Sequence, residues 1–460
     1  MRSYRTVRFG QSTRFTNPQE NAMNFTRKIL FGCLGICLTG SALAGGAVAS
    51  GSNDLSFGTK GVVVSNFSGA ARSVNLQSDG KIVVFGSEDK ITSEDRLVRY
   101  NPDGTLDNSF GNGGIVITGD FVGMYGWLES AIQADGKIII VGPEQVKTGT
   151  FRMERYNSNG TLDTTFGVNG VAIPNFGAHG ASAGLYDRPY AIKLQLDGKI
   201  LVGGQVATNQ VHYSGAVSGG TLTYASGFLV RFNVNGSADT TFGSNGVVIN
   251  PANSDSTNNS INGLAVQTNG QIVTSGSKPT LARYNANGSL DTTFGTNGQV
   301  FDPRVDISFI STSSTLIDGN GRITFAIGNY LGRYNSNGTP DSTFGTSGVL
   351  TVSSPNRWNV IAFQNGKIVT GGTEYTQTYN SRRDTWTTTQ VFALSRYLTT
   401  GALDTTFGTA GVVTTTLNNT DELFDMAIQG DNKIVAVGTT DIDPSASVVA
   451  SRFVVTRYNP

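Results

Sequence analysis

The side chains of this sequence that could bind a metal or act as nucleophiles are few. Its 460 residues include two histidines, His179 and His212, and two cysteines, Cys33 and Cys37. The histidines stand 33 positions apart, so they form no His-x-x-x-His pair of the kind that holds zinc. We therefore expect neither a metal site nor a cofactor.

A Gly-x-Ser-x-Gly sequence, typical of the nucleophile of serine hydrolases, occupies residues 180–184 and directly follows His179. That nucleophile lies on a sharp turn from a strand into a helix. Here the flanking residues are glycine and alanine, as in a connection between strands. We interpret the segment as such a connection, and we expect that the protein is not an enzyme.

Paired carboxylates are the main enzymatic alternative. A glycosidase needs two carboxyl groups that flank the bond to be cleaved. Glu129 and Asp425 could form such a pair in a hydrolase or lyase that acts on polysaccharides or esters. They lie far apart in the sequence, which cannot set the distance between them.

The elements that would position these groups are copies of one unit. The segment Arg-Tyr-Asn-x-x-Gly-x-Leu-Asp-x-x-Phe-Gly-x-x-Gly recurs, with 11 residues from its arginine to its phenylalanine in all six complete copies. The phenylalanines are Phe57, Phe110, Phe166, Phe242, Phe294, Phe344 and Phe407. The aspartates, three residues earlier, are Asp54, Asp107, Asp163, Asp239, Asp291, Asp341 and Asp404. The arginines are Arg99, Arg155, Arg231, Arg283, Arg333, Arg396 and Arg457. So constant a spacing predicts a repeat architecture.

Each unit has the pattern of four short strands. In the first unit, residues 73–77 and 81–85 flank an Asp-Gly turn, and residues 96–100 and 114–117 follow. Antiparallel strands in sets of four, repeated every 50–75 residues, are typical of the blades of a β-propeller. A solenoid coil would be shorter.

The first and last copies of the motif are incomplete in complementary ways. The copy with Phe57 has no Arg-Tyr-Asn before it, and the copy with Arg457 has no Phe-Gly after it. One unit is thus split between the two ends of the repeat region. We predict an all-β, seven-bladed propeller of four-stranded antiparallel blades, closed by pairing of an N-terminal strand at residues 61–64 with the C-terminal strands. Such closure leaves no open sheet edge.

These motifs resemble those of the delta-60 repeat, a bacterial β-propeller family whose members are largely uncharacterised. The resemblance covers about residues 53–460 and rests on the Leu-Asp-x-x-Phe-Gly and Asp-Gly-Lys-Ile elements. It implies a propeller fold and export. It implies no reaction and no catalytic residues.

The first 49 residues have the features of a signal peptide. Arg27 and Lys28 precede a short apolar run, and Ala-x-Ala sequences end at Ala44 and Ala49. Residues 1–22 stand before Met23, which is a natural start for this signal. We expect cleavage near Ala44 or Ala49 and a single propeller over residues 50–460.

The expected mature chain would be secreted or periplasmic, without a membrane anchor. Both cysteines lie in the signal, so it would contain no disulfide. Six basic groups and one acidic group lie in residues 1–49, which leaves 27 basic and 32 acidic groups, a net charge of −5. This charge argues against binding of nucleic acid. We also expect no stable insertion into a membrane, and a monomer.

The repeated residues are expected to be structural. The phenylalanine of each unit would fill the space between neighbouring blades, and the arginine and aspartate, eight positions apart, would form a buried ion pair. The alternative, a calcium loop around Asn101, Asp103 and Asp107, has too few ligands at EF-hand spacing.

Function is therefore expected in the segments that do not repeat. Variation in loop length falls on one face of the predicted ring, around the mouth of its channel, where rigid scaffolds often build binding sites. Trp127 and Trp358 occupy nearly equivalent places in their units. The candidate ligand-binding residues are Tyr125, Trp127, Glu129, Asp187, Arg188, His212, Tyr213, Arg357, Trp358, Arg382, Trp386, Asp421, Glu422 and Asp425. We predict a non-enzymatic binding scaffold for an extracellular glycan or protein. The alternatives are a hydrolase or lyase at the channel mouth and a purely structural envelope protein.

Overall fold

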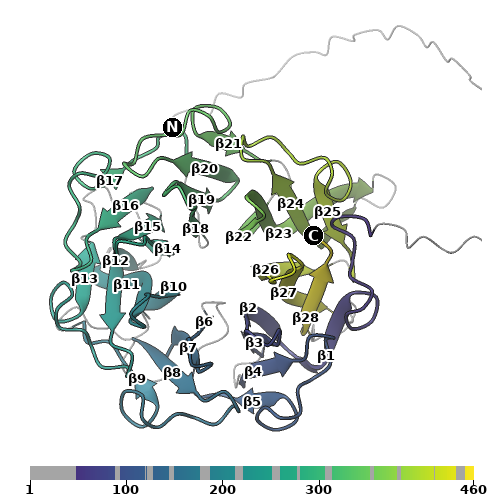
Figure 1. The fold of residues 1–460 in the computed structure, drawn as a ribbon, viewed down its shortest axis with the longest axis horizontal. Coiled ribbons are helices and arrows are strands. Elements are labelled where there is room, and N and C mark those ends of the chain that lie inside the picture. Colours follow the sequence, from purple (N-terminus) through teal and green to yellow (C-terminus); the bar gives the residue numbers. More distant parts are fainter. Residues whose placement is uncertain are drawn as a thin grey trace, which may run out of the picture. The chain divides into compact units, whose positions relative to one another are not determined.

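Seven four-stranded sheets surround a central channel (Figure 1). The computed structural model describes residues 48–88, 94–119, 121, 128–144, 150–176, 187–212, 221–250, 260–276, 280–305, 313–352, 357–380, 385–418, 420–441 and 451–460. Within these ranges no helix is long and apolar enough to cross a membrane.

The first four blades follow one another along the chain. Blade 1 contains β2 (Ala70–Leu76), β3 (Ile82–Ser87), β4 (Asp95–Tyr100) and β5 (Ile115–Ile117). Blade 2 contains β6 (Glu129–Ile132), β7 (Ile138–Pro143), β8 (Phe151–Tyr156) and β9 (Val171–Ala172). Blade 3 contains β10 (Arg188–Leu194), β11 (Ile200–His212), β12 (Thr221–Phe232) and β13 (Val247–Asn250). Blade 4 contains β14 (Ile261–Val266), β15 (Ile272–Gly276), β16 (Leu281–Tyr284) and β17 (Gln299–Val300).

The remaining blades include the one that closes the ring. Blade 5 contains β18 (Ser313–Ile317), β19 (Ile323–Ile327), β20 (Tyr330–Tyr334) and β21 (Val349–Thr351). Blade 6 contains β22 (Arg357–Gln364), β23 (Lys367–Asn380), β24 (Thr385–Tyr397) and β25 (Val412–Thr415). Blade 7 contains β26 (Glu422–Ile428), β27 (Ile434–Asp441), β28 (Ser451–Tyr458) and β1 (Val62–Ser68).

Blade 7 confirms the predicted closure. Its strand order is β26–β27–β28–β1, and β1 is antiparallel to β28, with Val62 opposite Thr456 and Val64 opposite Val454. The outer strand therefore comes from one end of the repeat region and the inner three from the other. Both the seven blades and the split blade were predicted correctly from the phase of the repeat.

A turn that precedes β1 is also assembled from both ends of the described chain. In blade 1, the Gly104 N–H donates to the Asn101 carbonyl at 2.9 Å. In blade 7, the Gly51 N–H donates to the Asn459 carbonyl at 2.9 Å, although these two residues come from opposite ends. Gly51 has a φ of +79°, close to the +88° of Gly104, a region that glycine enters without steric cost. The turn of blade 7 thus has the geometry of an ordinary turn.

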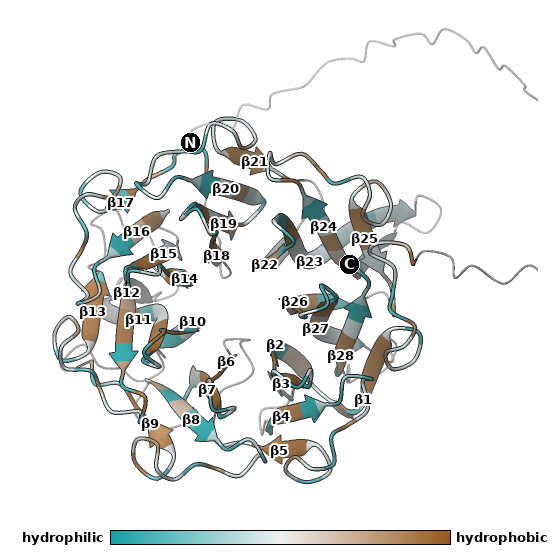
Figure 2. Ribbon diagram, in the orientation of Figure 1, coloured by the Kyte–Doolittle hydropathy of each residue, from teal (hydrophilic) through white to brown (hydrophobic). Residues whose placement is uncertain are grey.

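The core consists of seven separate hydrophobic clusters, each shared by two neighbouring blades. Figure 2 shows apolar residues along most of the strands, and hydrophilic residues at the ends of the third strands of blades, such as β8 and β12. Each cluster packs the face of one sheet against the next, so a blade is stable only between its neighbours.

The motif residues form a clamp between adjacent blades, as predicted. The seven repeat phenylalanines are fully buried. The arginine of blade 2, Arg155, pairs through Nε with Asp163 Oδ2 at 2.8 Å, and its guanidinium lies 4.6 Å from the centre of the Phe166 ring. Arg155 Nη1 also donates to the carbonyl of Val234 in blade 3 at 2.6 Å. The same arginine–aspartate pair, at 2.7–2.8 Å, occurs in every blade.

Two hairpins extend well beyond the length of the other strands. They are β11–β12 in blade 3 and β23–β24 in blade 6. Because strands alternate in direction, these hairpins lie on the same face as the connections that lead into the innermost strands. This is the face on which the sequence placed the variable loops.

Candidate functional site

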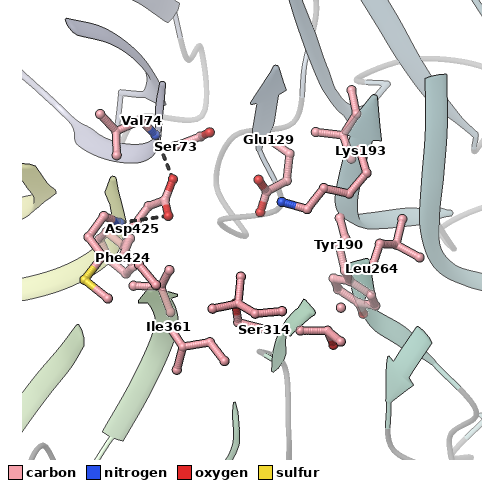
Figure 3. A pocket seen from close by; sticks show the side chains of 18 of the residues that line it. Ser73, Val74, Glu129, Tyr190, Lys193, Leu264, Ser314, Ile361, Phe424 and Asp425 are labelled. Atoms are coloured by element: carbon pink, nitrogen blue, oxygen red, sulfur yellow. Dashed lines mark hydrogen bonds between the residues drawn. The ribbon is translucent and has the colours of Figure 1, made fainter. Parts of the chain in front are cut away.

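The central channel contains a cavity of about 380 Å³. Its lining comes from the innermost strand of every blade: β2, β6, β10, β14, β18, β22 and β26. Figure 3 shows the side chains of Glu129, Lys193 and Asp425 around this space, each from a different blade.

Backbone irregularities occur in five of the innermost strands, among them the strands that carry Lys193 and Asp425. The pairing of β26 with β27 shifts register between Leu423 and Asp425, and corresponding shifts occur in β2, β10, β14 and β22. An extra residue of this kind bends a strand and re-aims its side chains. Glu129 and Asp425 occupy the same place in their repeats, eight residues before Lys137 and Lys433 respectively. Both carboxyls therefore reach the channel at a similar level.

Asp425 is held in a fixed orientation. Its Oδ2 accepts a hydrogen bond from the Val74 N–H of blade 1 at 2.8 Å, and its Oδ1 accepts one from the Met426 N–H at 2.8 Å (Figure 3). Burial inside the ring raises the pKa of Asp425 to about 6, against the opposing effect of these two N–H groups and of the Lys193 ammonium. The two N–H groups fix both carboxyl oxygens of Asp425 as acceptors.

Glu129 makes no hydrogen bond or ion pair with any residue that the structure describes. Burial raises its pKa well above the usual value, and the negative charge of Asp425 raises it further, while Lys193 acts in the opposite direction. The Glu129 side chain stays partly accessible through the channel. When it is protonated, this carboxyl can donate a hydrogen bond to a molecule in the cavity.

Lys193 of β10 extends toward Glu129 in Figure 3 and is exposed to the channel. Around these groups the lining is mixed. The Arg72 guanidinium lies 3.9 Å from the centre of the Phe424 ring. The hydroxyls of Ser73 and Ser130 are hydrogen bonded to each other at 2.8 Å.

The arrangement places two carboxyls, whose pKa values burial raises, and an ammonium around one space. Two carboxyls that flank one space can serve as an acid and a base. The same groups can instead donate to and accept from the hydroxyls of a ligand. Among the described residues, no group of three or more His, Cys, Asp or Glu side chains could hold a metal ion.

The predicted site residues are only partly brought together. Glu129 and Asp425 line the cavity. Asp187 and Asp421 are buried, and Asp421 accepts hydrogen bonds from Leu417 N, Asn418 N and Thr440 Oγ1, which fixes the connection into β26. Arg188 and Glu422 are the first residues of β10 and β26 and do not line the cavity.

The other predicted residues lie away from the cavity or outside the described ranges. Trp386 is 65 % exposed in the β23–β24 hairpin, where it contacts Tyr379 with ring centres 5.0 Å apart. His212 ends β11, and Arg357 and Trp358 begin β22, but their side chains are outside the described part. Tyr125, Trp127, Tyr213 and Arg382 fall outside it entirely, as do His179 and the Gly-x-Ser-x-Gly segment at 180–184.

Sequence reasoning missed Lys193 and the inner strands as the lining of the site. It looked for function in connections of variable length, whereas the cavity is formed by strands. An alignment of the repeats could have pointed to Lys193. It stands six residues before the lysine that precedes the second strand of its blade, and the same position is Asn75 in blade 1 and Ala131 in blade 2.

Comparison with known proteins supports the fold. Four stretches, residues 77–110, 133–166, 217–242 and 267–294, match the model of a domain of unknown function (DUF5122) beta-propeller. The chain is thus similar to a known β-propeller repeat, and this match does not test the resemblance to the delta-60 repeat. No curated protein matches the sequence.

Several solved structures match the chain at low similarity. A neuraminidase-like protein from A/bat/Guatemala/164/2009 is 8% identical, with 89% of this chain and 97% of that chain covered and a TM-score of 0.36. A gluconolactonase from Xanthomonas campestris is 12% identical, with coverages of 67% and 84% and a TM-score of 0.30. A thermostable family-43 glycoside hydrolase is 9% identical, with coverages of 88% and 92% and a TM-score of 0.29. Likeness at this level says nothing about activity.

Proposed function

We propose that this protein is an exported binding scaffold that takes a small hydroxyl-rich ligand, such as the terminal sugar of a glycan, into the mouth of its central channel. The observation that carries the proposal is the convergence of Glu129, Lys193 and Asp425 on one cavity. Glu129 and Lys193 make no side-chain hydrogen bond within the described ranges, and Lys193 acts on both carboxyls through its charge. Charged and polar groups held in this way are available to a ligand.

The size and the lining of the cavity support a ligand of this kind. Its volume of about 380 Å³ lies within the range of small-molecule sites, roughly 300–1,000 Å³. Hydrogen-bonding groups on β2, β6 and β10 line the same cavity as apolar side chains such as Phe424, Ile361 and Leu264. A sugar ring has hydroxyls at its edge and C–H groups on its faces, and therefore matches both kinds of surface.

The test is a glycan array probed with the protein, followed by titration calorimetry on each positive glycan with the Asp425→Asn variant. Asparagine keeps one oxygen that can accept from the Val74 N–H, but it loses the charge and places an NH2 group beside the Met426 N–H, so circular dichroism first checks that the variant folds. We expect at least a roughly tenfold loss of affinity, as for removal of a charged hydrogen bond. Asp431→Asn is the matched control, because Asp431 lies in the same blade, in the turn at the other end of β26, and its side chain is 55% exposed.

An unchanged affinity in the Asp425→Asn variant would contradict the proposed location of the site. Failure of every glycan would contradict the binding function and favour a structural role.

A hydrolase is a second candidate, favoured by the presence of two carboxyls, Glu129 and Asp425, in the lining of one cavity. In that reaction Glu129 would give its proton to the leaving oxygen while the glycosidic bond breaks. Asp425 would take a proton from a water molecule whose oxygen bonds to the anomeric carbon. Incubation of positive glycans with the protein, with assay of new reducing ends, separates the two functions. Release that is abolished by Glu129→Gln would replace the binding-only proposal, and binding without release would eliminate the hydrolase.

A further inference from the structure

The β23–β24 hairpin extends beyond the sheet of blade 6 as a two-stranded ribbon. The pairing of β22 with β23 reaches Thr373, and the pairing of β25 with β24 reaches Phe392. Beyond these points, residues 374–380 and 385–391 pair with each other and form the ribbon. Residues 375–379 are all exposed in succession. Because successive side chains of a strand point to opposite faces, solvent reaches both faces of the ribbon.

The aromatic side chains of the ribbon all lie on one of these faces. Residues opposite each other in antiparallel strands share a face, and every second residue along a strand returns to it. Tyr379 is opposite Trp386, and Tyr375, four positions earlier, is opposite Gln390. This aromatic face consists of Tyr375, Gln377, Tyr379, Trp386, Thr388 and Gln390.

The rings of the aromatic face are open to solvent. Tyr375, Tyr379 and Trp386 are 39 %, 47 % and 65 % exposed. The rings of Tyr379 and Trp386 lie 5.0 Å apart between centres, at an interplanar angle of 42°, so they form one continuous surface. Exposed apolar surface bordered by polar side chains marks an interaction site more often than a scattered exposed residue does.

The size of the aromatic face limits what it can bind. From Tyr375 to Tyr379 the strand advances by about 13 Å, and the two strands lie about 5 Å apart, so the face covers on the order of 200 Å². A stable protein interface buries about 800 Å² on each partner. The face is therefore too small to hold a protein partner by itself, but its long and narrow outline matches an extended polymer chain.

The chemistry of the aromatic face matches a chain of sugars. A sugar ring has C–H groups on its faces, which pack against aromatic rings, and hydroxyls at its edge. The amides of Gln377 and Gln390 and the hydroxyl of Thr388 can donate to and accept from such hydroxyls. The six side chains of the face carry no charge, so they offer an acidic polymer no ionic partner.

We propose that the aromatic face of the β23–β24 ribbon binds an extended chain of a neutral polysaccharide. This site is separate from the channel, since none of its six residues lines the cavity. The channel would take one terminal sugar, whereas the ribbon would hold a polymer along its length.

The experiment is affinity electrophoresis of the purified protein in native gels that contain a soluble polysaccharide. The neutral probes are hydroxyethylcellulose, xyloglucan, laminarin and galactomannan, and the acidic comparison is carboxymethylcellulose. We expect at least one neutral polymer to retard the protein, and Trp386→Ala to weaken its binding at least roughly tenfold, because the largest ring of the face is lost. Tyr375→Ala is a second variant, which leaves the contact between Tyr379 and Trp386 in place and also weakens binding.

Two control variants separate this site from its surroundings. Thr387→Ala changes the exposed neighbour of Trp386, which the register places on the opposite face of the ribbon, and it leaves binding unchanged. Asp425→Asn changes the channel and also leaves binding of the polymer unchanged. The ribbon site therefore survives a failure of the channel proposal, and the channel proposal survives a failure of the ribbon site.

Four outcomes would overturn the inference. The first is that no neutral polymer retards the protein, and the second is that carboxymethylcellulose retards it more than every neutral polymer. The third is that Trp386→Ala and Tyr375→Ala bind as the parent does, or that Asp425→Asn abolishes binding, which would place the polymer in the channel. The fourth is that the parent self-associates in analytical ultracentrifugation and Trp386→Ala does not, which would show that a second copy covers the face.

Discussion

Removal of residues Arg457–Pro460 is expected to destabilise the whole ring. In most proteins the loss of four terminal residues has little effect, because chain ends are poorly packed. Here the segment ends β28 and contacts residues from the opposite end of the described chain. The Arg457 Nε lies 2.7 Å from Asp54 Oδ2, and the Asn459 N–H donates to the Ser52 carbonyl at 2.8 Å.

The size of the effect follows from two losses. Without Arg457, the buried Asp54 keeps only Lys433 as a cationic partner, at 3.1 Å, and breaking such a pair costs about 3–5 kcal/mol. Tyr458 is fully buried with its hydroxyl 2.8 Å from Thr415 Oγ1, and removing a large core side chain costs about 3–5 kcal/mol. The two losses share a site and are not additive. We expect a decrease of about 6 kcal/mol in the free energy of unfolding, a large part of the total for a domain.

Urea unfolding followed by circular dichroism measures this decrease. If the truncated chain does not fold, Asp54→Asn provides a smaller perturbation of the same contact, with an expected loss of about 3 kcal/mol. A circular permutant that joins Pro460 directly to Ser50, with new ends elsewhere, is the control and should be at least as stable as the parent. A truncated protein within about 0.5 kcal/mol of the parent would refute the closure argument.

Three further perturbations test the electrostatics, the turn and the exposed hairpin. Burial, and to a smaller extent the charge of Glu154, raises the pKa of Asp95 from 3.8 to about 8. The folded state therefore keeps a proton that the unfolded chain releases. The stability of the folded state falls as the pH rises from about 4 to 8. Asp95→Asn should therefore gain stability relative to the parent between pH 5 and pH 9 by at most about 5 kcal/mol in urea titrations, and a constant difference would contradict this. Gly51→Ala should lower the free energy of unfolding by about 2 kcal/mol, and Gly366→Ala by about 1 kcal/mol. Both glycines have a positive φ, but a Cβ at Gly51 would lie 2.6 Å from a methyl group of Val413, whereas a Cβ at Gly366 would have no atom within 4 Å. Equal melting points would count against the assembled turn. Trp386→Ala should change stability by no more than about 0.5 kcal/mol, since its ring is 65 % exposed, and a larger loss in thermal melts would show that the ring is core.

The fold was largely predictable because each repeat specifies its blade locally. The Asp-Gly turns, the alternation of the strands and the interval of 11 residues between arginine and phenylalanine act within one unit. The clamp of Arg155, Asp163 and Phe166 is therefore built from residues close in the sequence. Its additional bond to Val234 of the next blade could not be predicted, because it depends on how two sheets pack.

The site was less predictable because its residues come from separate blades. Glu129 and Asp425 were considered as a pair, but only the closed ring brings blades 7 and 2 close together, with blade 1 between them. Lys193 was missed, because its repeat position is occupied by neutral residues in the first two units. Several other candidates, among them Trp127 and Arg382, lie outside the described residues and stay predictions.

The sequence by itself determined how many blades there are, where the chain crosses between them and which residues clamp neighbouring sheets. These properties follow from local turn chemistry and from a spacing that every copy keeps. The tertiary structure alone decided that the innermost strands enclose a cavity and that two carboxyls and an ammonium face it. The physical reason is that the distance between groups on different blades, and the burial that shifts their pKa values, exist only once the ring has closed.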